Sequence, residues 1–236
     1  TNVYRAQSGA FELVRGPIFT EVLLADEVNR TPPKTQAALL EAMEERQVTI
    51  DGTRHPLGEA FFVVATQNPI EYEGTYPLPE AQTDRFLMKV RVGYPAAEEE
   101  TELLRRAGRG FDAHDLEAAG VGPVLGREEL AALRARARAL PAADPVLAYV
   151  ARLARGSREL GRVRLGASPR GAVSLLAAAR ARAALRGADW LSPDDVKAVA
   201  RPVLRHRLVL RPEAELEGAT PDDLVEELLE TVEVPR

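Results

Sequence analysis

The spacing of apolar residues changes near Gly93, where the chain is predicted to pass from α/β to helical structure. Before that point, residues 22–25 and 61–66 are short apolar runs, of the kind that form strands buried on both faces of a sheet. Residues 34–46, between them, have the apolar spacing of a helix. The order strand, helix, strand is typical of a parallel sheet flanked by helices.

After that point, strand patterns nearly vanish and alanine and leucine recur at helical spacing. Six helices are predicted, over residues 97–107, 127–140, 145–160, 169–185, 193–204 and 221–232. Three of them begin with a hydroxyl side chain followed by proline, at Ser168, Ser192 and Thr220, which is a typical N-cap with proline at the first helical position. Asp195 and Asp223 complete capping boxes in the last two. The glycine-rich stretch 108–126 predicts a loop.

Two β-hairpins are predicted within the α/β part. Residues 48–54 alternate around an Asp-Gly turn at 51–52, and residues 3–13 turn at 8–9. A doubly wound sheet has no topological need for a hairpin between a helix and the next strand. Two interpretations therefore stay open: the hairpins are surface decoration, or they protrude to touch a partner or substrate.

Two adjacent acids, Asp26 and Glu27, end the first predicted strand. Open α/β sheets bind their ligands at the carboxyl ends of the strands. One carboxylate there can hold the water shell of Mg²⁺, while its neighbour orients or deprotonates an attacking water. A solvated strand end followed by a helix cap explains the same short pattern, so support from a second strand is needed.

The second predicted strand provides that support, because it ends in a neutral amide, Asn68, just before a proline. An amide beside a hydrolytic carboxylate can hold the attacking water or a γ-phosphate oxygen without neutralising the base. Asn29 also follows a predicted strand. The alternative for Asn68 is an ordinary Asn-Pro turn.

Two arginines are candidates for contact with an anion. Arg85 follows a short helical stretch, where it either forms a surface ion pair with Asp84 or Glu80 or serves as an arginine finger. Arg170 lies in the first turn of a predicted helix, where the helix dipole disfavours a cation, so we expect an anion to meet it. The three histidines are scattered without ligand spacing, and no metal role is expected for them.

Composition excludes several classes of protein. An apolar fraction of 45% over 236 residues rules out global disorder, and the absence of cysteine rules out a disulfide scaffold, a zinc ribbon or a thiol nucleophile. A net charge of −5 disfavours a nucleic-acid-binding surface. No apolar run approaches the roughly 20 residues of a membrane span, and no signal peptide is recognised, so a cytoplasmic protein is expected.

Four segments in this order resemble the MoxR family of AAA+ ATPases. They are Ala-Asp-Glu-Val-Asn-Arg at 25–30, the helix and strand at 36–48, the stretch from Ala-Thr-Gln-Asn-Pro to Pro-Glu-Ala-Gln at 65–82, and Gly-Ala-Ser-Pro-Arg at 166–170. The resemblance implies a hexameric ring that holds ATP between subunits. It also implies a chaperone-like remodelling or maturation factor that acts on client proteins, often together with a von Willebrand factor A domain protein.

The same resemblance implies a role for each candidate residue. Asp26 and Glu27 fall on the Walker B pair, with Asp26 for Mg²⁺ and Glu27 for water activation. Asn68 falls on sensor 1, Arg85 on the arginine finger that acts on a neighbour's ATP, and Arg170 on sensor 2 of the lid. The implied cofactors are ATP and Mg²⁺.

One departure from the family pattern is severe, because no phosphate-binding loop (Walker A) can be placed in this chain. None of the three lysines follows a glycine or alanine. We therefore expect an α/β fold with an incomplete AAA+ P-loop NTPase core at residues 1–95, followed by an all-α linker and lid at 96–236. The favoured interpretation is a fragment of an ATP-hydrolysing remodelling protein. The alternatives are a non-catalytic assembly module of a ring complex and a ring ATPase of the magnesium-chelatase type.

Overall fold

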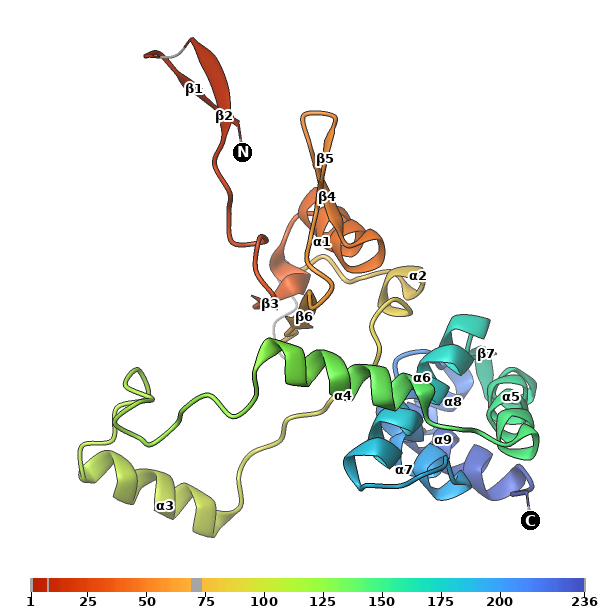
Figure 1. Cartoon of the computed structure of the whole chain (residues 1–236). Helices are drawn as coiled ribbons and strands as arrows, with labels where there is room; N and C mark the ends of the chain where they lie inside the picture. The colour runs from red at the N-terminus through yellow and green to blue at the C-terminus, as the bar shows by residue number, and fades with distance from the viewer. Residues whose placement is uncertain (1, 8, 69–73, 236) are drawn as a thin grey trace. The chain divides into compact units, whose positions relative to one another are not determined.

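The computed structural model describes residues 2–7, 9–68 and 74–235 (Figure 1). These residues divide into two units, one that ends at Leu87 and one that begins at Met88. Residues 88–96 contain no helix or strand. The domain boundary predicted after residue 95 therefore lies within an irregular connection and stays a prediction.

The first unit contains two hairpins, a parallel pair of strands and one long helix. Its elements are β1 (Asn2–Arg5), β2 (Ala10–Leu13), β3 (Val22–Ala25), the 3₁₀ helix η1 (Val28–Arg30), α1 (Pro33–Glu45), β4 (Gln47–Ile50), β5 (Thr53–Pro56), β6 (Phe62–Ala65) and α2 (Glu80–Thr83). β1 pairs with β2 and β4 with β5, both antiparallel, so the two predicted hairpins are confirmed. Asp51 and Gly52 both have positive φ, as the tight turn between β4 and β5 requires. Ser8, in the other predicted turn, lies outside the described residues.

β3 and β6 lie side by side and parallel, with Val22 opposite Phe62 and Ala25 opposite Ala65. Side chains alternate between the two faces of this pair. Leu23 and Val63 pack against a small core around Ala42 of α1.

The opposite face of the same pair is apolar and open. Its four large side chains are 43–64% exposed: Val22, Leu24, Phe62 and Val64. The prediction that both strands are buried on both faces is therefore wrong for this chain. The described residues cover one face only, because α1 and the β4–β5 hairpin pack on the same side.

The second unit is mainly helical. Its elements are α3 (Ala97–Gly108), α4 (Arg127–Ala139), α5 (Asp144–Glu159), β7 (Val163–Leu165), α6 (Pro169–Leu185), α7 (Pro193–Leu204), β8 (Val209–Leu210), α8 (Pro212–Leu216) and α9 (Pro221–Thr231). The six predicted helices are confirmed, with ends that differ by at most a residue or so, and residues 109–126 contain no helix or strand. The all-α prediction is wrong in one detail, because β7 and β8 form a small antiparallel pair.

The predicted caps form as the sequence indicates. Ser168, Ser192 and Thr220 each accept a hydrogen bond from the backbone N–H three residues ahead, at 3.2–3.3 Å. Capping of this kind is worth about 1 kcal/mol per helix. The capped helices pack with α5 around fully buried Tyr149 and Leu175.

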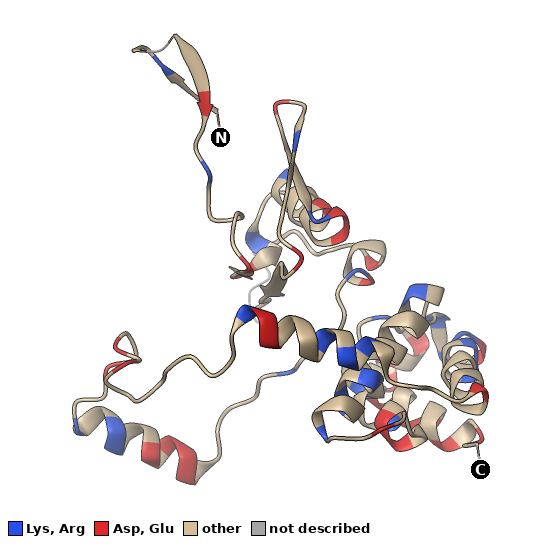
Figure 2. Ribbon diagram, in the orientation of Figure 1, with Lys and Arg blue, Asp and Glu red and all other residues tan. Residues whose placement is uncertain are grey.

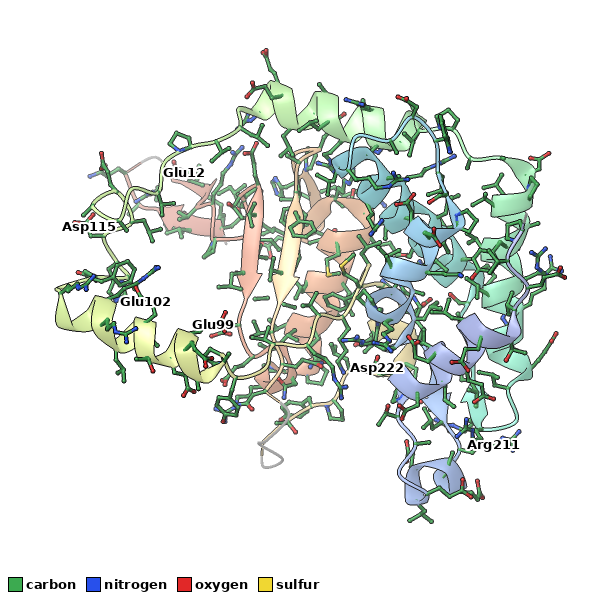
Figure 3. The ribbon with its side chains drawn as sticks, turned by 90° about the horizontal axis from the view of Figure 1, so that it is seen from below. Glu12, Glu99, Glu102, Asp115, Arg211 and Asp222 are labelled. Atoms are coloured by element: carbon green, nitrogen blue, oxygen red, sulfur yellow. The ribbon has the colours of Figure 1, made fainter. Side chains whose placement is uncertain are left out.

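The helix α3 shows how charge follows the helix dipole. Acidic residues occupy its first turn and Arg105 and Arg106 its last, which stabilises both ends, and Figure 2 shows the two signs at opposite ends. Glu99 and Glu102 are labelled on it in Figure 3. The Glu99 carboxylate accepts the backbone N–H of Ala96 at 2.8 Å, and Glu102 accepts from Arg106 at 3.2 Å.

A buried carboxylate joins α6 to α7. Asp195 is fully buried and accepts hydrogen bonds from Arg182 at 2.6 Å and from Arg186 at 2.8 and 2.9 Å. The Ser192 hydroxyl and backbone N–H donate to the same carboxylate at 2.6 and 3.1 Å. The hydrogen bonds from Arg186, then those from Ser192, hold the pKa of Asp195 well below its usual range, although burial opposes them.

Candidate functional site

The two acids lie at the carboxyl end of β3, where backbone pairing with the β6 segment continues beyond both strands. The Thr66 N–H donates to the Ala25 carbonyl at 3.0 Å, and the Val28 N–H donates to the Thr66 carbonyl at 3.0 Å. Asp26 and Glu27 lie between these two bonds. The turn that carries them is therefore held to the neighbouring segment on both sides.

Glu27 adopts a left-handed backbone conformation, with φ 50° and ψ 51°. This conformation costs a non-glycine residue roughly 1–2 kcal/mol, so the surrounding bonds must hold it in place. The Glu27 N–H donates to the Thr66 hydroxyl at 2.8 Å. Its carboxylate lies 3.5 Å from Arg30 Nε and is partly exposed.

Thr66 links the two acids through its side chain, a role that the sequence analysis missed. Its hydroxyl donates to Oδ1 of Asp26 and accepts the N–H of Glu27. The signal was present in the sequence, since Thr66 is a hydroxyl residue at the end of the second predicted strand. It went unused because nothing in the local pattern shows which residues of the first strand it faces.

A buried amide, Asn29, connects the acids to Asn68. Asn29 Nδ2 donates to the backbone carbonyl of Asn68 at 3.5 Å, while its Oδ1 is buried and accepts no hydrogen bond from the described residues. The Asn29 carbonyl accepts the N–H of Tyr76 at 2.6 Å. Gln36 of α1 donates to the carbonyls of Val28 and Tyr76 at 3.2 and 2.9 Å. Asn68, which is half-buried, is thereby brought beside the turn that carries the acids.

Arg85 follows α2 and forms an ion pair with Glu44 of α1. The sequence suggested Asp84 or Glu80 as its ion-pair partner, and the observed partner is a residue that the sequence did not suggest. Both side chains of the observed pair are about one-third exposed. The pair holds Arg85 against α1, on the same unit as the acids.

Arg170 lies in the first turn of α6, in the second unit, and it is exposed. The next residue, Gly171, packs against Arg207, a buried arginine that the sequence analysis also missed. A Cβ at Gly171 would lie 2.9 Å from Cδ of Arg207. Arg207 donates to the carbonyl of Val203 and, at 3.3 Å, to the hydroxyl of Ser174. The first turn of α6 thus packs against the buried side chain of Arg207.

The donor set at the acids fits a magnesium ion that arrives with phosphates. Within residues 2–7, 9–68 and 74–235, no three acidic or histidine side chains gather as a metal site. Mg²⁺ commonly uses one or two carboxylates and completes its shell with water and substrate phosphates. Asp26 is exposed, and Thr66 engages only one of its oxygens among the described contacts, so it can serve as such a ligand.

The chain shares both of its units with known ATPases. Residues 1–88 match the model of the ATPase family associated with various cellular activities (AAA), and residues 155–228 match the AAA lid domain. Protein MoxR of Methylorubrum extorquens is 32% identical over 254 residues, which span 99% of this chain and 74% of that protein. The chain belongs to the MoxR family of AAA ATPases.

Two other relatives are more similar in sequence. YeaC of Bacillus subtilis, an uncharacterized protein, is 45% identical over 234 residues, 99% of this chain and 72% of YeaC. Chaperone MoxR1 of Mycobacterium tuberculosis is 43% identical over 245 residues, 100% of this chain and 63% of MoxR1. The chain thus spans 63–74% of the length of these three relatives.

A solved structure confirms the fold. The crystal structure of a candidate ATPase from Cytophaga hutchinsonii superimposes with a TM-score of 0.89 at 38% identity, over 100% of this chain and 73% of that one. The predicted fold class, a partial AAA core followed by a helical lid, is therefore confirmed for this MoxR-family chain. Among the described helices, none has the length and apolar character that crossing a bilayer requires.

Proposed function

We propose that this chain carries the water-activating, metal-binding and sensing side of an ATP-hydrolysing MoxR protein that remodels or matures protein complexes. Residues 1–95 form its partial core and 96–236 its linker and lid. The observation that carries the proposal is the juxtaposition of Asp26, Glu27 and Asn68 at the carboxyl end of one parallel strand pair. Membership of the AAA ATPase family implies nucleotide binding.

Each acid has a distinct task in this proposal. Glu27 takes a proton from the attacking water, and Asp26 holds the Mg²⁺ that accompanies the phosphates. Bound Mg²⁺ screens the charge of the β- and γ-phosphates. Asn68 orients the water or a phosphate oxygen without neutralising Glu27. Asp26 is exposed and Glu27 is partly exposed, which supports these tasks because a ligand can reach both acids.

In the proposal, the two arginines act from outside the turn at residues 25–28 that carries Asp26 and Glu27, called here the acid turn. Arg85 reaches the ATP of a neighbouring subunit, for which its ion pair with Glu44 must open. Arg170 senses the nucleotide from the lid, and its exposed place in the first turn of α6 leaves it accessible. The task of Arg85 requires a neighbouring subunit, so a hexameric homo-oligomer forms part of the proposal.

A phosphate-binding element must come from outside these 236 residues for hydrolysis to occur, because the chain contains no Gly-Lys-Ser or Gly-Lys-Thr sequence. Backbone amides and a lysine of such a loop bind the phosphates that the acids would repel. Client proteins and a von Willebrand factor A domain partner follow from the family resemblance. The name of the relative Chaperone MoxR1 supports the remodelling role.

The test uses a protein that contains this chain together with a phosphate-binding loop. Glu27→Gln should abolish ATP hydrolysis while Mg-ATP still binds, because glutamine keeps the shape of the side chain and removes the base. Glu45→Gln, at the exposed end of α1, is the matched control and should keep the normal rate. Hydrolysis by the Glu27→Gln variant at a near-normal rate would refute the assignment and favour a non-catalytic assembly module.

A further inference from the structure

Thr66 is hydrogen-bonded to each residue of the turn that carries the acids, from Ala25 to Val28. We infer that Thr66 is a positioning residue, whose hydroxyl sets the geometry of both Asp26 and Glu27 for hydrolysis. The inference rests on the proposed function of the two acids. Its evidence is a set of four hydrogen bonds between Thr66 and residues 25–28, two from the backbone and two from the hydroxyl.

The Thr66 hydroxyl has a single proton, so it can donate one of its two hydrogen bonds and must accept the other. The N–H of Glu27 can only donate, so the Thr66 oxygen must accept from it. The hydroxyl proton is then available for the Asp26 carboxylate. One oxygen of Asp26 is engaged in this way, and the other remains to face a ligand.

The backbone of Glu27 depends on the same hydroxyl. Its left-handed conformation is unfavourable, and the Thr66 hydroxyl accepts the hydrogen bond of the Glu27 N–H at 2.8 Å. Without an acceptor at Thr66, the peptide between Asp26 and Glu27 can rotate toward a relaxed conformation. The Glu27 side chain would then point in a different direction. A displacement of about 1 Å at a catalytic group can lower the rate roughly a hundredfold.

A substitution of Thr66 can remove its side-chain hydrogen bonds while its backbone hydrogen bonds stay in place. Thr66→Val keeps the shape of the side chain and the bonds of its N–H and carbonyl to Ala25 and Val28, so the turn should still form. Only the two hydroxyl bonds are lost. Thr66→Ser restores the hydroxyl without the methyl group.

Thr31, which follows the 3₁₀ helix η1 directly after the acids, provides a matched control. Its hydroxyl donates to the carbonyl of Val28 at 2.7 Å and touches neither acid. That carbonyl also accepts from the N–H of Thr31 and from Gln36, both at 3.2 Å. Thr31→Val therefore removes one threonine hydroxyl close to the site while the acids keep all of their bonds.

The first measurement is steady-state hydrolysis of Mg-ATP by the protein that also carries a phosphate-binding loop. Thr66→Val should lower kcat by about 10- to 100-fold, the usual cost of removing a residue that orients a ligand. KM should change by less than about threefold, because the loop provides most of the nucleotide binding. Thr66→Ser should recover kcat to within about threefold of the wild-type value, and Thr31→Val should leave it unchanged.

The second measurement needs no nucleotide and uses the 236-residue chain itself. Amide hydrogen exchange, followed by NMR, should be about tenfold faster at Glu27 in Thr66→Val than in the wild type. The Val28 amide should keep its rate, because its acceptor is the Thr66 carbonyl.

The outcomes separate this inference from the proposed function. Normal kcat in Thr66→Val beside an inactive Glu27→Gln overturns the positioning role and leaves the proposed function standing. Normal kcat in both variants overturns both. The positioning role also fails where Thr66→Ser is as slow as Thr66→Val, where Thr31→Val is equally slow, or where the Glu27 amide exchanges at the wild-type rate in Thr66→Val.

Discussion

Replacing Asp195 with asparagine is expected to destabilise the helical unit by about 2–3 kcal/mol. The carboxylate is fully buried and accepts hydrogen bonds from Arg182, Arg186 and Ser192. Asparagine offers one acceptor oxygen in place of two, and its NH₂ group would face arginine donors. The bonds between α6 and α7 would therefore break while the arginines lose their counter-charge.

The magnitude follows from the exposure of the partners. Removing one member of a buried ion pair costs about 3–5 kcal/mol when the remaining charge stays buried. Arg182 and Arg186 have side chains that are 44% and 47% exposed, so they can turn to water and the cost is lower. A loss of about 2–3 kcal/mol should lower the Tm of a unit this size by roughly 5–10 °C.

The assay is urea unfolding at 25 °C, followed by far-UV circular dichroism, since the helices from α3 to α9 lie in the helical unit. Asp194→Asn is the matched control, because it makes the same change on an exposed neighbour in the same first turn. The control should cost no more than about 0.5 kcal/mol.

The pH dependence gives an independent check. The pKa of Asp195 is lower in the folded state than in the unfolded state, so its contribution to stability is present above the ordinary carboxyl pKa of about 4. That contribution is lost as the pH falls toward the folded-state pKa. The stability gap between wild type and Asp195→Asn should therefore narrow from pH 6 to pH 3. Equal effects of the two asparagine variants, or a gap that stays constant over this range, would refute the reasoning.

Three further predictions test other parts of the molecule. Arg85→Ala, in the protein with a phosphate-binding loop, should lose roughly three to five powers of ten in turnover, and mixing it with Glu27→Gln subunits should recover activity. If no mixture recovers, the ion pair of Arg85 with Glu44 is its whole role. The 236-residue chain should show no saturable binding of Mg-ATP by calorimetry, and low-micromolar binding would reveal an unrecognised phosphate site. Gly166→Ala should destabilise the helical unit by about 1–3 kcal/mol in urea, because its Cβ would lie 2.6 Å from the Ser157 carbonyl. Gly161→Ala, with open space around it, is the control, and equal stability of the two variants contradicts the clash.

The helices of the helical unit were predicted well, because short local sequence motifs mark where several of them begin. Ser168, Ser192 and Thr220 each bond to a residue three positions ahead, so the whole motif is contained in four consecutive letters. The Asp51-Gly52 turn is equally local. The pair β7 and β8 was missed because strands of three and two residues are too short to show a period.

The contacts that shape the candidate site were harder to predict, because they join distant segments. Thr66 and Asp26 are 40 residues apart in the sequence, and Arg207 meets Ser174 across 33. The sequence indicated that Asp26, Glu27 and Asn68 end their strands, but no local pattern shows which hydroxyl they face. The exposed face of β3 and β6 was missed for a related reason, since an apolar run looks alike whether one face or two are covered.

The parallel pairing of β3 with β6 determines when the acid turn can form as the chain is made. Helix α1 and the β4–β5 hairpin close over short stretches of sequence and can form within microseconds. The bonds between Thr66 and Asp26 must wait until 40 more residues have been added. At 5–20 residues per second, synthesis leaves the two acids without their partner for about 2–8 s. The hydrogen bonds that position Asp26 therefore form only after α1 and the β4–β5 hairpin can already have folded.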